Sequence, residues 1–287
     1  MLTTVGYLGP KATFTEYAVK SIFHNEKRVP YASIYDCLDA VKNGEVTFGV
    51  VPLENTIEGS VTITLDYLIH EHPLPIIGEI IVPIQQQLMV HPNNQDHVEQ
   101  ITAVYSHSHA LAQCRKFFAT TYPDAQQTQT LSTSAAAQFV ANHPEQNIAA
   151  IANELAAVEY GLTIRANNIQ DYESNHTRFI IIHSQEGESL TTSTPNNKTT
   201  FIVTLPSDQA GTLHQVLAAF AWRKINLTKI ESRPMKTGLG NYLFIIDIDR
   251  AMDTILIPGA ISELEALGCG VTCLGSYPVI KIEALIR

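Results

Sequence analysis

Polar side chains gather in four short segments of the N-terminal part of this chain, each beside a predicted strand. Open α/β sheets bind ligands just beyond the ends of their strands, so these segments are candidates for a site. They are residues 9–14 (GPKATF), 51–61 (VPLENTIEGSV), 106–109 (SHSH) and 175–179 (NHTRF). Together they offer hydroxyl, amide, carboxylate, imidazole and guanidinium groups to a ligand.

Each segment has a structural interpretation beside the functional one. The segment 9–14 opens a predicted helix, whose free N–H groups and positive dipole end suit a carboxylate. Ordinary capping of that helix by Thr13 explains the same residues. The loop 51–61 is either a functional loop on a rigid sheet or a polar surface turn. Thr177 and Arg178 precede an apolar strand and, taken alone, are compatible with a structural role.

Metal chemistry has little support in the sequence. His107 and His109 are two residues apart and do not share a helix face. Cys269 and Cys273 form the only close cysteine pair, with no further ligand at suitable spacing. Four scattered cysteines in 287 residues do not indicate a disulfide framework, and we expect reduced, buried thiols. We therefore expect neither a metal nor a cofactor.

Composition and charge restrict the class of protein. Apolar residues make up 45% of the chain and charged residues 16%, which is typical of a globular protein with a sizeable core. The formal net charge of -10 is opposite to that of a nucleic-acid or anionic-membrane binder. The N-terminus lacks the pattern of a secretory signal, and no apolar stretch reaches the roughly 18 residues of a membrane span. We expect a cytoplasmic protein.

The elements that position these segments belong to two parts of the chain. Residues 184–199 (SQEGESLTTSTPNNKT) are polar and read as a linker between parts 1–183 and 200–287. The first part alternates short strands with helices, as an α/β domain does. We expect strands near 4–8, 48–51, 77–90, 103–105, 148–151 and 177–183, and helices from 14, from 34 (capped by Ser33), at about 108–119 and at 134–142.

The second part has a different order of elements. We expect strands at 201–205, 226–232, 242–248 and 271–282, helices at about 213–220 and 258–267, and a turn at 238–240. Leu213, Val216, Leu217 and Phe220 follow the spacing of an amphipathic helix. The order β-α-β-β-α-β predicts a ferredoxin-like unit.

The polar segments together resemble the motifs of the prephenate dehydratase family. That family has a Gly-Pro start, a Pro-x-Glu-Asn loop, a Ser-His segment ending in Gln-Cys and a Thr-Arg-Phe signature. They are matched, in order, by 9–15, 52–56, 106–114 and 177–179. Residues 226–234, which end in Glu-Ser-Arg-Pro, resemble the family's regulatory ACT domain.

The resemblance implies a catalytic domain of two lobes, like periplasmic binding proteins, with the substrate between them. By analogy, residues 1–78 and 158–183 form lobe one and 79–157 form lobe two, followed by a 184–199 linker and an ACT domain at 200–287. The implied reaction removes carbon dioxide and water from prephenate and leaves phenylpyruvate. Its main need is a donor at the departing hydroxyl.

By resemblance, Thr177 is the catalytic residue that attends this hydroxyl. Either Arg178 or the helix start near Thr13 holds the pyruvyl carboxylate, and Arg178→Lys then raises KM more than it lowers kcat. Neighbouring strand residues point to opposite faces, so Thr177 and Arg178 share a cleft only at a strand end. The implied substrate-binding residues are Thr13, Asn55, Thr56, Ser60, Ser106, Gln113, Asn175, Arg178 and Phe179.

The ACT resemblance implies inhibition by L-phenylalanine and a homo-oligomer, either a dimer or a tetramer. Gly211-Thr212-Leu213 departs from the family's Gly-Ala-Leu run, which bears on effector affinity. Two other functions stay open from sequence: an arogenate dehydratase and a non-catalytic amino-acid-binding regulator. The implied effector-binding residues are Ala210, Gly211, Leu213, Asn226, Glu231 and Ser232.

Overall fold

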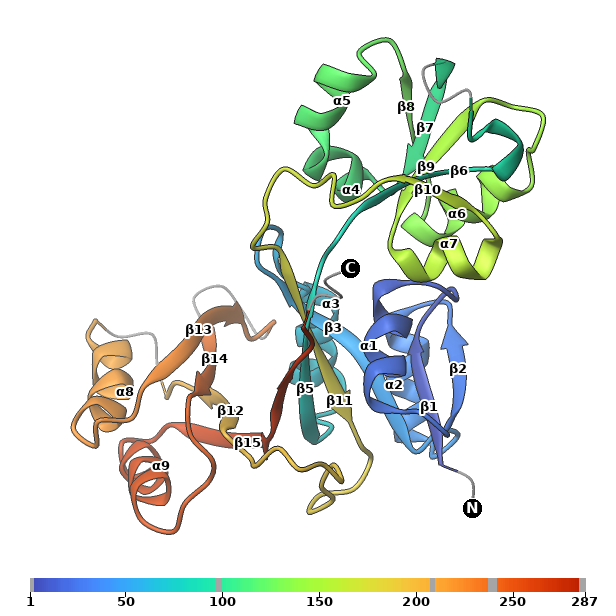
Figure 1. The fold of residues 1–287 in the computed structure, drawn as a ribbon. Coiled ribbons are helices and arrows are strands. Elements are labelled where there is room, and N and C mark those ends of the chain that lie inside the picture. Colours follow the sequence, from blue (N-terminus) through green and yellow to red (C-terminus); the bar gives the residue numbers. More distant parts are fainter. Residues whose placement is uncertain (1–2, 97–99, 207–209, 237–241, 284–287) are drawn as a thin grey trace.

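The computed structural model describes residues 3–96, 100–206, 210–236 and 242–283, arranged as two α/β lobes and a C-terminal domain (Figure 1). Each of the three parts is built on its own sheet. Lobe two stands at one end of lobe one, and the C-terminal domain lies against the side of lobe one. The expected fold class, two-lobed α/β with a ferredoxin-like third part, is confirmed.

Lobe one contains a seven-stranded mixed sheet in the order β16-β5-β11-β3-β1-β2, with β4 paired to β3. Its helices α1 and α2 begin at side chains predicted to cap them, because Thr13 and Ser33 accept hydrogen bonds from the N–H groups of Glu16 and Asp36. Its elements are β1 (Thr4–Leu8), α1 (Phe14–Ile22), β2 (Lys27–Tyr31), α2 (Ile34–Lys42), β3 (Phe48–Asn55), β4 (Gly59–Ser60), α3 (Thr62–Asp66), a π-helical turn (Tyr67–Glu71), β5 (Ile76–Pro83) and β11 (His176–Ile182).

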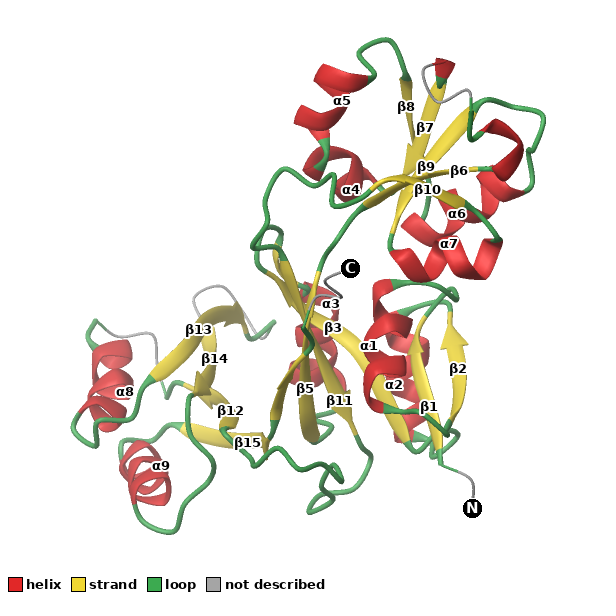
Figure 2. Cartoon of the chain, viewed as in Figure 1, coloured by secondary structure: helices red, strands yellow, loops and turns green. Residues whose placement is uncertain are grey.

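Lobe two contains a five-stranded sheet in the order β10-β6-β9-β7-β8. Two segments, 84–86 and 167–175, connect it to lobe one (Figure 2). Its elements are β6 (Gln87–Val90), a 3-10 turn (Pro92–Asn94), β7 (Ala103–Ser106), α4 (Ser108–Gln113), α5 (Arg115–Thr121), β8 (Gln126–Gln129), α6 (Thr133–Ala141), β9 (Ile148–Ala152), α7 (Glu154–Tyr160) and β10 (Thr163–Ala166).

The two sheets divide the chain later than the expected lobe boundaries at 78/79 and 157/158. All of β5 lies in the sheet of lobe one, and both α7 and β10 lie in lobe two. Residues 76–90 read IIGEIIVPIQQQLMV, and the polar run Gln85–Gln87 stands where the chain changes sheets. Pairing partners agree with this position: β5 pairs with β11, and β6 pairs with β9 and β10.

The C-terminal domain has a four-stranded sheet in the order β13-β14-β12-β15. Helices α8 and α9 cover one face of it, and the other face packs on lobe one (Figure 1). The expected turn at 238–240 lies outside the described residues. The elements are β12 (Lys198–Thr204), α8 (Thr212–Ala221), β13 (Leu227–Pro234), β14 (Tyr242–Ile248), α9 (Leu256–Ala266), β15 (Gly270–Tyr277) and β16 (Val279–Lys281).

The strand expected over 271–282 is two strands that belong to different sheets. β15 pairs with β12, whereas β16 pairs in parallel with β5 of lobe one. Pro278 separates them; it has no N–H to continue a ladder, and its carbonyl accepts from the N–H of Glu79 at 3.0 Å. Residues 279–281 therefore return to the sheet of lobe one.

The C-terminal domain and lobe one also share a hydrophobic core. Buried Ile202, Leu243, Ile245 and Tyr277 from the C-terminal sheet belong to the same cluster as side chains of lobe one, such as Leu65. Buried apolar area of this kind stabilises an interface in the same way as a domain interior. The C-terminal domain is thus fixed to lobe one by packing as well as by chain connection.

Candidate active site

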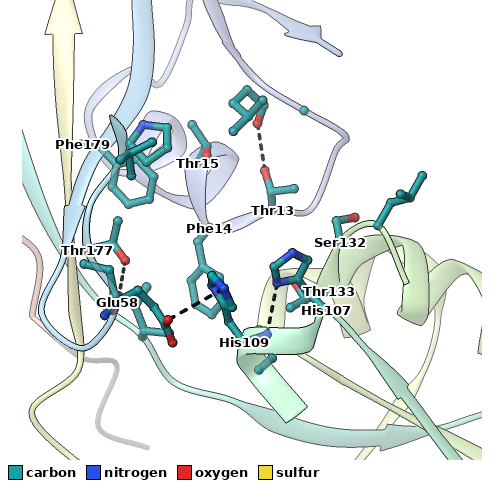
Figure 3. A pocket seen from close by; sticks show the side chains of 18 of the residues that line it. Thr13, Phe14, Thr15, Glu58, His107, His109, Ser132, Thr133, Thr177 and Phe179 are labelled. Atoms are coloured by element: carbon teal, nitrogen blue, oxygen red, sulfur yellow. Dashed lines mark hydrogen bonds and ion pairs between the residues drawn. The ribbon is translucent and has the colours of Figure 1, made fainter. Parts of the chain in front are cut away.

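A cleft of about 1060 Å³ lies between the two lobes. Lobe one contributes the start of α1, the loop from β3 to β4, and β11; lobe two contributes α4 and the start of α6. Figure 3 shows these elements facing one another across the pocket. Four of the sequence segments singled out for their polar side chains therefore reach one cleft.

Thr177 and Phe179 both line the cleft from β11, because residues two apart on a strand point to the same face (Figure 3). The hydroxyl Oγ1 of Thr177 accepts a hydrogen bond from Asn55 Nδ2 at 2.9 Å. Thr177 is only 9% exposed. Its hydroxyl is accordingly held at the cleft wall by a neighbouring strand.

Arg178 points to the opposite face of β11 and does not line the cleft. We therefore assign it an interdomain contact in place of the hypothesis that it holds a substrate carboxylate. Its guanidinium bonds to Glu54 at 2.6 Å, to Glu79 at 2.7 Å and to Asp247 of the C-terminal domain at 2.6 Å. Burial alone would lower the pKa of this guanidinium, but Glu79 and Asp247 raise it above its ordinary value. Arg178 is a permanently charged interdomain contact.

Asn175 and Thr56 are not among the residues that line the cleft, but both bond to segments that do. Asn175, 1% exposed, accepts from Asn55 Nδ2 at 2.8 Å and donates to Gln113 Oε1 at 3.0 Å. Thr56 Oγ1 accepts from the N–H of His176 at 3.0 Å. These two residues join the β3–β4 loop to the chain that leads into β11.

Ser106 does not reach the cleft, although its neighbours do. It is fully buried and donates to the carbonyl of Ile151 at 2.7 Å, which ties β7 to β9. The cap of α4 is His107, whose Nδ1 accepts from the N–H of His109. The resemblance implied that Ser106 binds the substrate; its buried position and its bond to Ile151 indicate a structural role instead.

Ser60 and Gln113 line the cleft from opposite lobes. Gln113 Nε2 donates to Glu58 Oε1 at 3.1 Å. Ser60 Oγ donates to Glu231 of the C-terminal domain and accepts from Lys229 Nζ at 2.8 Å. One cleft hydroxyl is therefore in direct contact with the third domain.

The cleft offers an anion backbone N–H groups in place of cationic side chains. Among the described residues that line it there is no lysine or arginine. The starts of α1, capped by Thr13, and of α6, capped by Ser132, both open into it (Figure 3). Helix N-termini stabilise negative charge through their free N–H groups and dipole.

Several polar residues that line the cleft were not among the expected substrate-binding residues, among them Glu58, His109 and Gln86. His109 Nε2 lies 3.8 Å from Glu58 Oε2. Burial and the neighbouring His109 lower the pKa of His107, which opposes its protonation. The sequence shows a carboxylate at position 58 in the loop 51–61. Its proximity to the His109 imidazole depends on how the two lobes pack, which the local sequence does not show.

The described residues contain no group of three or more His, Cys, Asp or Glu side chains that could hold a metal ion. Cys37 and Cys114 are buried, and burial raises the pKa of each thiol to about 12. In the part of the chain that the structure describes, no helix is long and apolar enough to span a membrane.

The expected effector residues divide between two neighbouring elements of the C-terminal domain. Ala210 and Gly211 immediately precede α8 and are exposed, and Leu213 is 38% exposed within it. Asn226, Glu231 and Ser232 lie at the start of β13 or on it, the edge strand of its sheet. Gly211 has a φ of 94°, a left-handed conformation that glycine adopts without strain.

Two family matches cover most of the chain. Residues 5–187 match the family described as prephenate dehydratase, and residues 199–269 match the ACT domain. The chain is 55% identical to the prephenate dehydratase of Bacillus subtilis (strain 168) over 278 residues, which cover 95% of this chain and 98% of that one. This chain belongs to the prephenate dehydratase family.

Solved structures of prephenate dehydratases agree with this assignment. The crystal structure from Arthrobacter aurescens, in complex with L-Phe, superimposes with a TM-score of 0.86 at 35% identity and covers 96% of this chain and 90% of that one. The one from Staphylococcus aureus subsp. aureus Mu50 gives a TM-score of 0.78 at 29% identity, covering 96% and 100%.

Proposed function

We propose that this chain converts prephenate to phenylpyruvate, carbon dioxide and water, without a cofactor. One observation carries the proposal: the Thr177 hydroxyl stands at the cleft wall and accepts from Asn55, which leaves its own proton to a substrate. We place this reaction in the cytoplasm. The four cysteines are unpaired, which is compatible with that compartment; Cys37, Cys114 and Cys269 are buried as expected, whereas Cys273 is exposed.

In the proposed reaction, the bond between the ring and its carboxylate breaks and releases carbon dioxide. Its electron pair enters the ring, and the carbon–oxygen bond on the far side of the ring breaks. The departing oxygen must gain one proton to leave as water. Thr177 donates a hydrogen bond that strengthens as charge develops on this oxygen, because a hydroxyl is too weak an acid for early transfer.

The two substrate carboxylates have different needs, and the cleft has surfaces for both. An ion pair at the departing carboxylate would stabilise the ground state and slow the reaction. Apolar side chains, among them Phe14, Ile84 and Phe179, line part of the cleft. The pyruvyl carboxylate is a permanent handle, and we assign it to the N–H groups at the starts of α1 and α6.

We further propose that L-phenylalanine inhibits the enzyme by binding at the C-terminal domain of a dimer or tetramer. The residues expected to bind it lie on an exposed edge strand and at an adjacent helix start, as a site shared between two copies would require. Glu231 lies on that strand and bonds to Ser60 in the cleft. This contact connects the effector surface with the catalytic lobe.

The test is a turnover assay of the full chain with prephenate, followed by phenylpyruvate absorbance, with and without L-phenylalanine. We expect turnover that falls as phenylalanine is added. Conversion of arogenate in preference to prephenate would change the substrate assignment. No turnover of either compound, together with heat of binding for an amino acid, would favour a non-catalytic regulator.

A further inference from the structure

A chain of side-chain hydrogen bonds runs from Glu58 to Thr177 and passes through both lobes. Gln113 Nε2 donates to Glu58 Oε1 at 3.1 Å, and Asn175 Nδ2 donates to Gln113 Oε1 at 3.0 Å. Asn55 Nδ2 then donates to Asn175 Oδ1 at 2.8 Å and to Thr177 Oγ1 at 2.9 Å. Every link pairs a donor with an acceptor, and each donor–acceptor distance is that of an ordinary hydrogen bond.

We infer that Glu58 is a positioning residue for the reaction: its carboxylate holds the Gln113 end of this chain, as backbone N–H groups hold the Asn55 end, so that the whole chain keeps the one direction in which the Thr177 proton is directed to the substrate. The inference rests on the proposed function of Thr177. Glu58 acts through Gln113, Asn175 and Asn55, and it is assigned no contact with the reacting atoms.

The direction follows from which groups can donate. An ionised carboxylate only accepts, so the NH₂ group of Gln113 must face Glu58 and its carbonyl must face Asn175. The NH₂ group of Asn175 then faces Gln113, and its carbonyl faces Asn55. Reversing any one amide would place two donors or two acceptors together, which costs free energy in a buried site.

The other end of the chain has the same direction for an independent reason. Asn55 Oδ1 accepts from the backbone N–H groups of Ile57 at 2.9 Å and Glu58 at 3.0 Å. Its NH₂ group therefore faces Asn175 and Thr177. Because Thr177 Oγ1 accepts from Asn55, the Thr177 hydroxyl keeps its proton for an acceptor in the cleft.

Burial makes this order matter. Asn175, Gln113 and Thr177 are 1%, 7% and 9% exposed, so water has little access to replace a partner lost by these three, whereas Glu58 at the outer end of the chain is exposed. Gln113 comes from lobe two and is held between Glu58 of lobe one and Asn175 at the end of the connecting segment 167–175. The chain is thus complete only when α4 is seated against lobe one.

A direct substrate contact explains Glu58 less well. Prephenate carries two carboxylates, and a third carboxylate in a cleft without lysine or arginine among its described lining residues would repel it. Glu58 instead receives Gln113 and lies 3.8 Å from His109. Both neighbours come from α4. Gln113 donates to one oxygen of the Glu58 carboxylate, and the His109 imidazole lies beside the other.

The test exchanges the carboxylate and the amide between positions 58 and 113. Gln113→Glu alone brings two carboxylates together, and we expect kcat to fall by at least roughly 100-fold with a smaller change in KM. Glu58→Gln alone keeps an acceptor oxygen and should cost less than about tenfold. The double variant E58Q/Q113E restores a carboxylate that accepts from both sides, and kcat should return to within about tenfold of wild type.

Gln86→Glu is the matched control, since it adds the same charge to the same cleft outside the chain. If net charge alone matters, Glu58→Gln will rescue Gln86→Glu as well as it rescues Gln113→Glu. We expect rescue only at position 113. Thermal unfolding of each variant identifies those that fold. If the double variant does not fold, Glu58→Ala replaces it, and an unchanged kcat there overturns the inference.

Wild-type turnover in the same assay separates the two levels of the proposal. An inert wild type removes the proposed function itself. An active wild type with no rescue in the double variant removes the role of Glu58. A Glu58→Gln variant that changes preference between arogenate and prephenate would show a substrate contact, and would also overturn the inference.

Discussion

Thr177 and Arg178 are neighbours in sequence with separate tasks in space. Thr177 faces the cleft, and Arg178 faces Glu79 and Asp247 behind the sheet. The sequence suggested a hydroxyl and a cation near one site, but which face of β11 meets the cleft depends on its register with β3 and β5. That register is set by contacts between strands far apart in the sequence. The alternation of side chains along a strand showed that Thr177 and Arg178 point to opposite faces, but it did not show which of them faces the cleft.

The Thr177 hydroxyl is expected to carry most of the assistance to the leaving group. Thr177→Ala should lower kcat by roughly 10²–10⁴, the range of a lost acid–base group. Thr177→Ser retains the hydroxyl and is the matched control, with a much smaller loss. Steady-state turnover of prephenate measures both, and a near-normal kcat for the alanine variant would contradict the assignment.

Asn55 is expected to act through the same hydroxyl. Asn55→Asp removes the NH₂ donor, so the Thr177 proton would turn to the new carboxylate and away from the substrate. We expect a fall in kcat of at least roughly 100-fold. Combined with Thr177→Ala, the substitution should add little, because both remove one function. Additive losses would indicate that Asn55 acts elsewhere.

At the scale of elements, β11 is held between the cleft and a cluster of charges. Arg178 bonds to Glu54 on β3, Glu79 on β5 and Asp247 on β14, and Lys198 on β12 also reaches Glu79 at 2.7 Å. The strand that carries Thr177 is thus braced by the C-terminal domain. The cores and the order of elements were predictable from periodicity. This cluster joins residues from five separate strands, so no local sequence pattern indicated it.

Removal of the Arg178 guanidinium should therefore affect stability first. Arg178→Met leaves Glu79 and Asp247 buried with fewer partners, and we expect a loss of about 3–5 kcal/mol in the free energy of unfolding. Arg223→Met, which breaks the more exposed pair with Glu263, should cost less than about 1 kcal/mol. Urea denaturation measures both. A raised KM at unchanged stability would restore a substrate contact for Arg178.

The contact between α3 and β13 should depend on pH. Burial alone would raise the pKa of Asp66, but Arg233 and Lys236 together lower it below its ordinary value. A carboxyl with a lowered folded-state pKa stabilises the fold above its unfolded value of about 3.9 and loses that contribution as pH falls through the folded value. Wild type should exceed Asp66→Asn in stability near pH 7, and the difference should shrink below about pH 4.

Unfolding curves of both proteins across this range measure the difference. A difference that stays constant down to pH 3 would show that the Asp66 charge makes no contribution.

At the scale of the whole molecule, the sequence predicted three parts in the right order but not how they join. The polar run 184–199 marked a connection, and the βαββα order was readable from hydrophobic spacing. The final strand was not, since Val279–Lys281 continues the apolar pattern of β15 in sequence. Its partner β5 is almost two hundred residues earlier, and local spacing carries no information about such a distant pairing.

The pairing of β16 with β5 makes the third domain a loop of chain anchored at both ends. A protease that cuts only between residues 184 and 197 will sever the backbone, but the downstream piece still contributes a strand to the upstream sheet. We expect two bands on a denaturing gel and one species on a sizing column. Separate elution of the pieces would contradict this. By the same reasoning, a stop codon after residue 183 removes a strand from the catalytic sheet along with the regulator, so such a truncation is not a clean deletion of regulation.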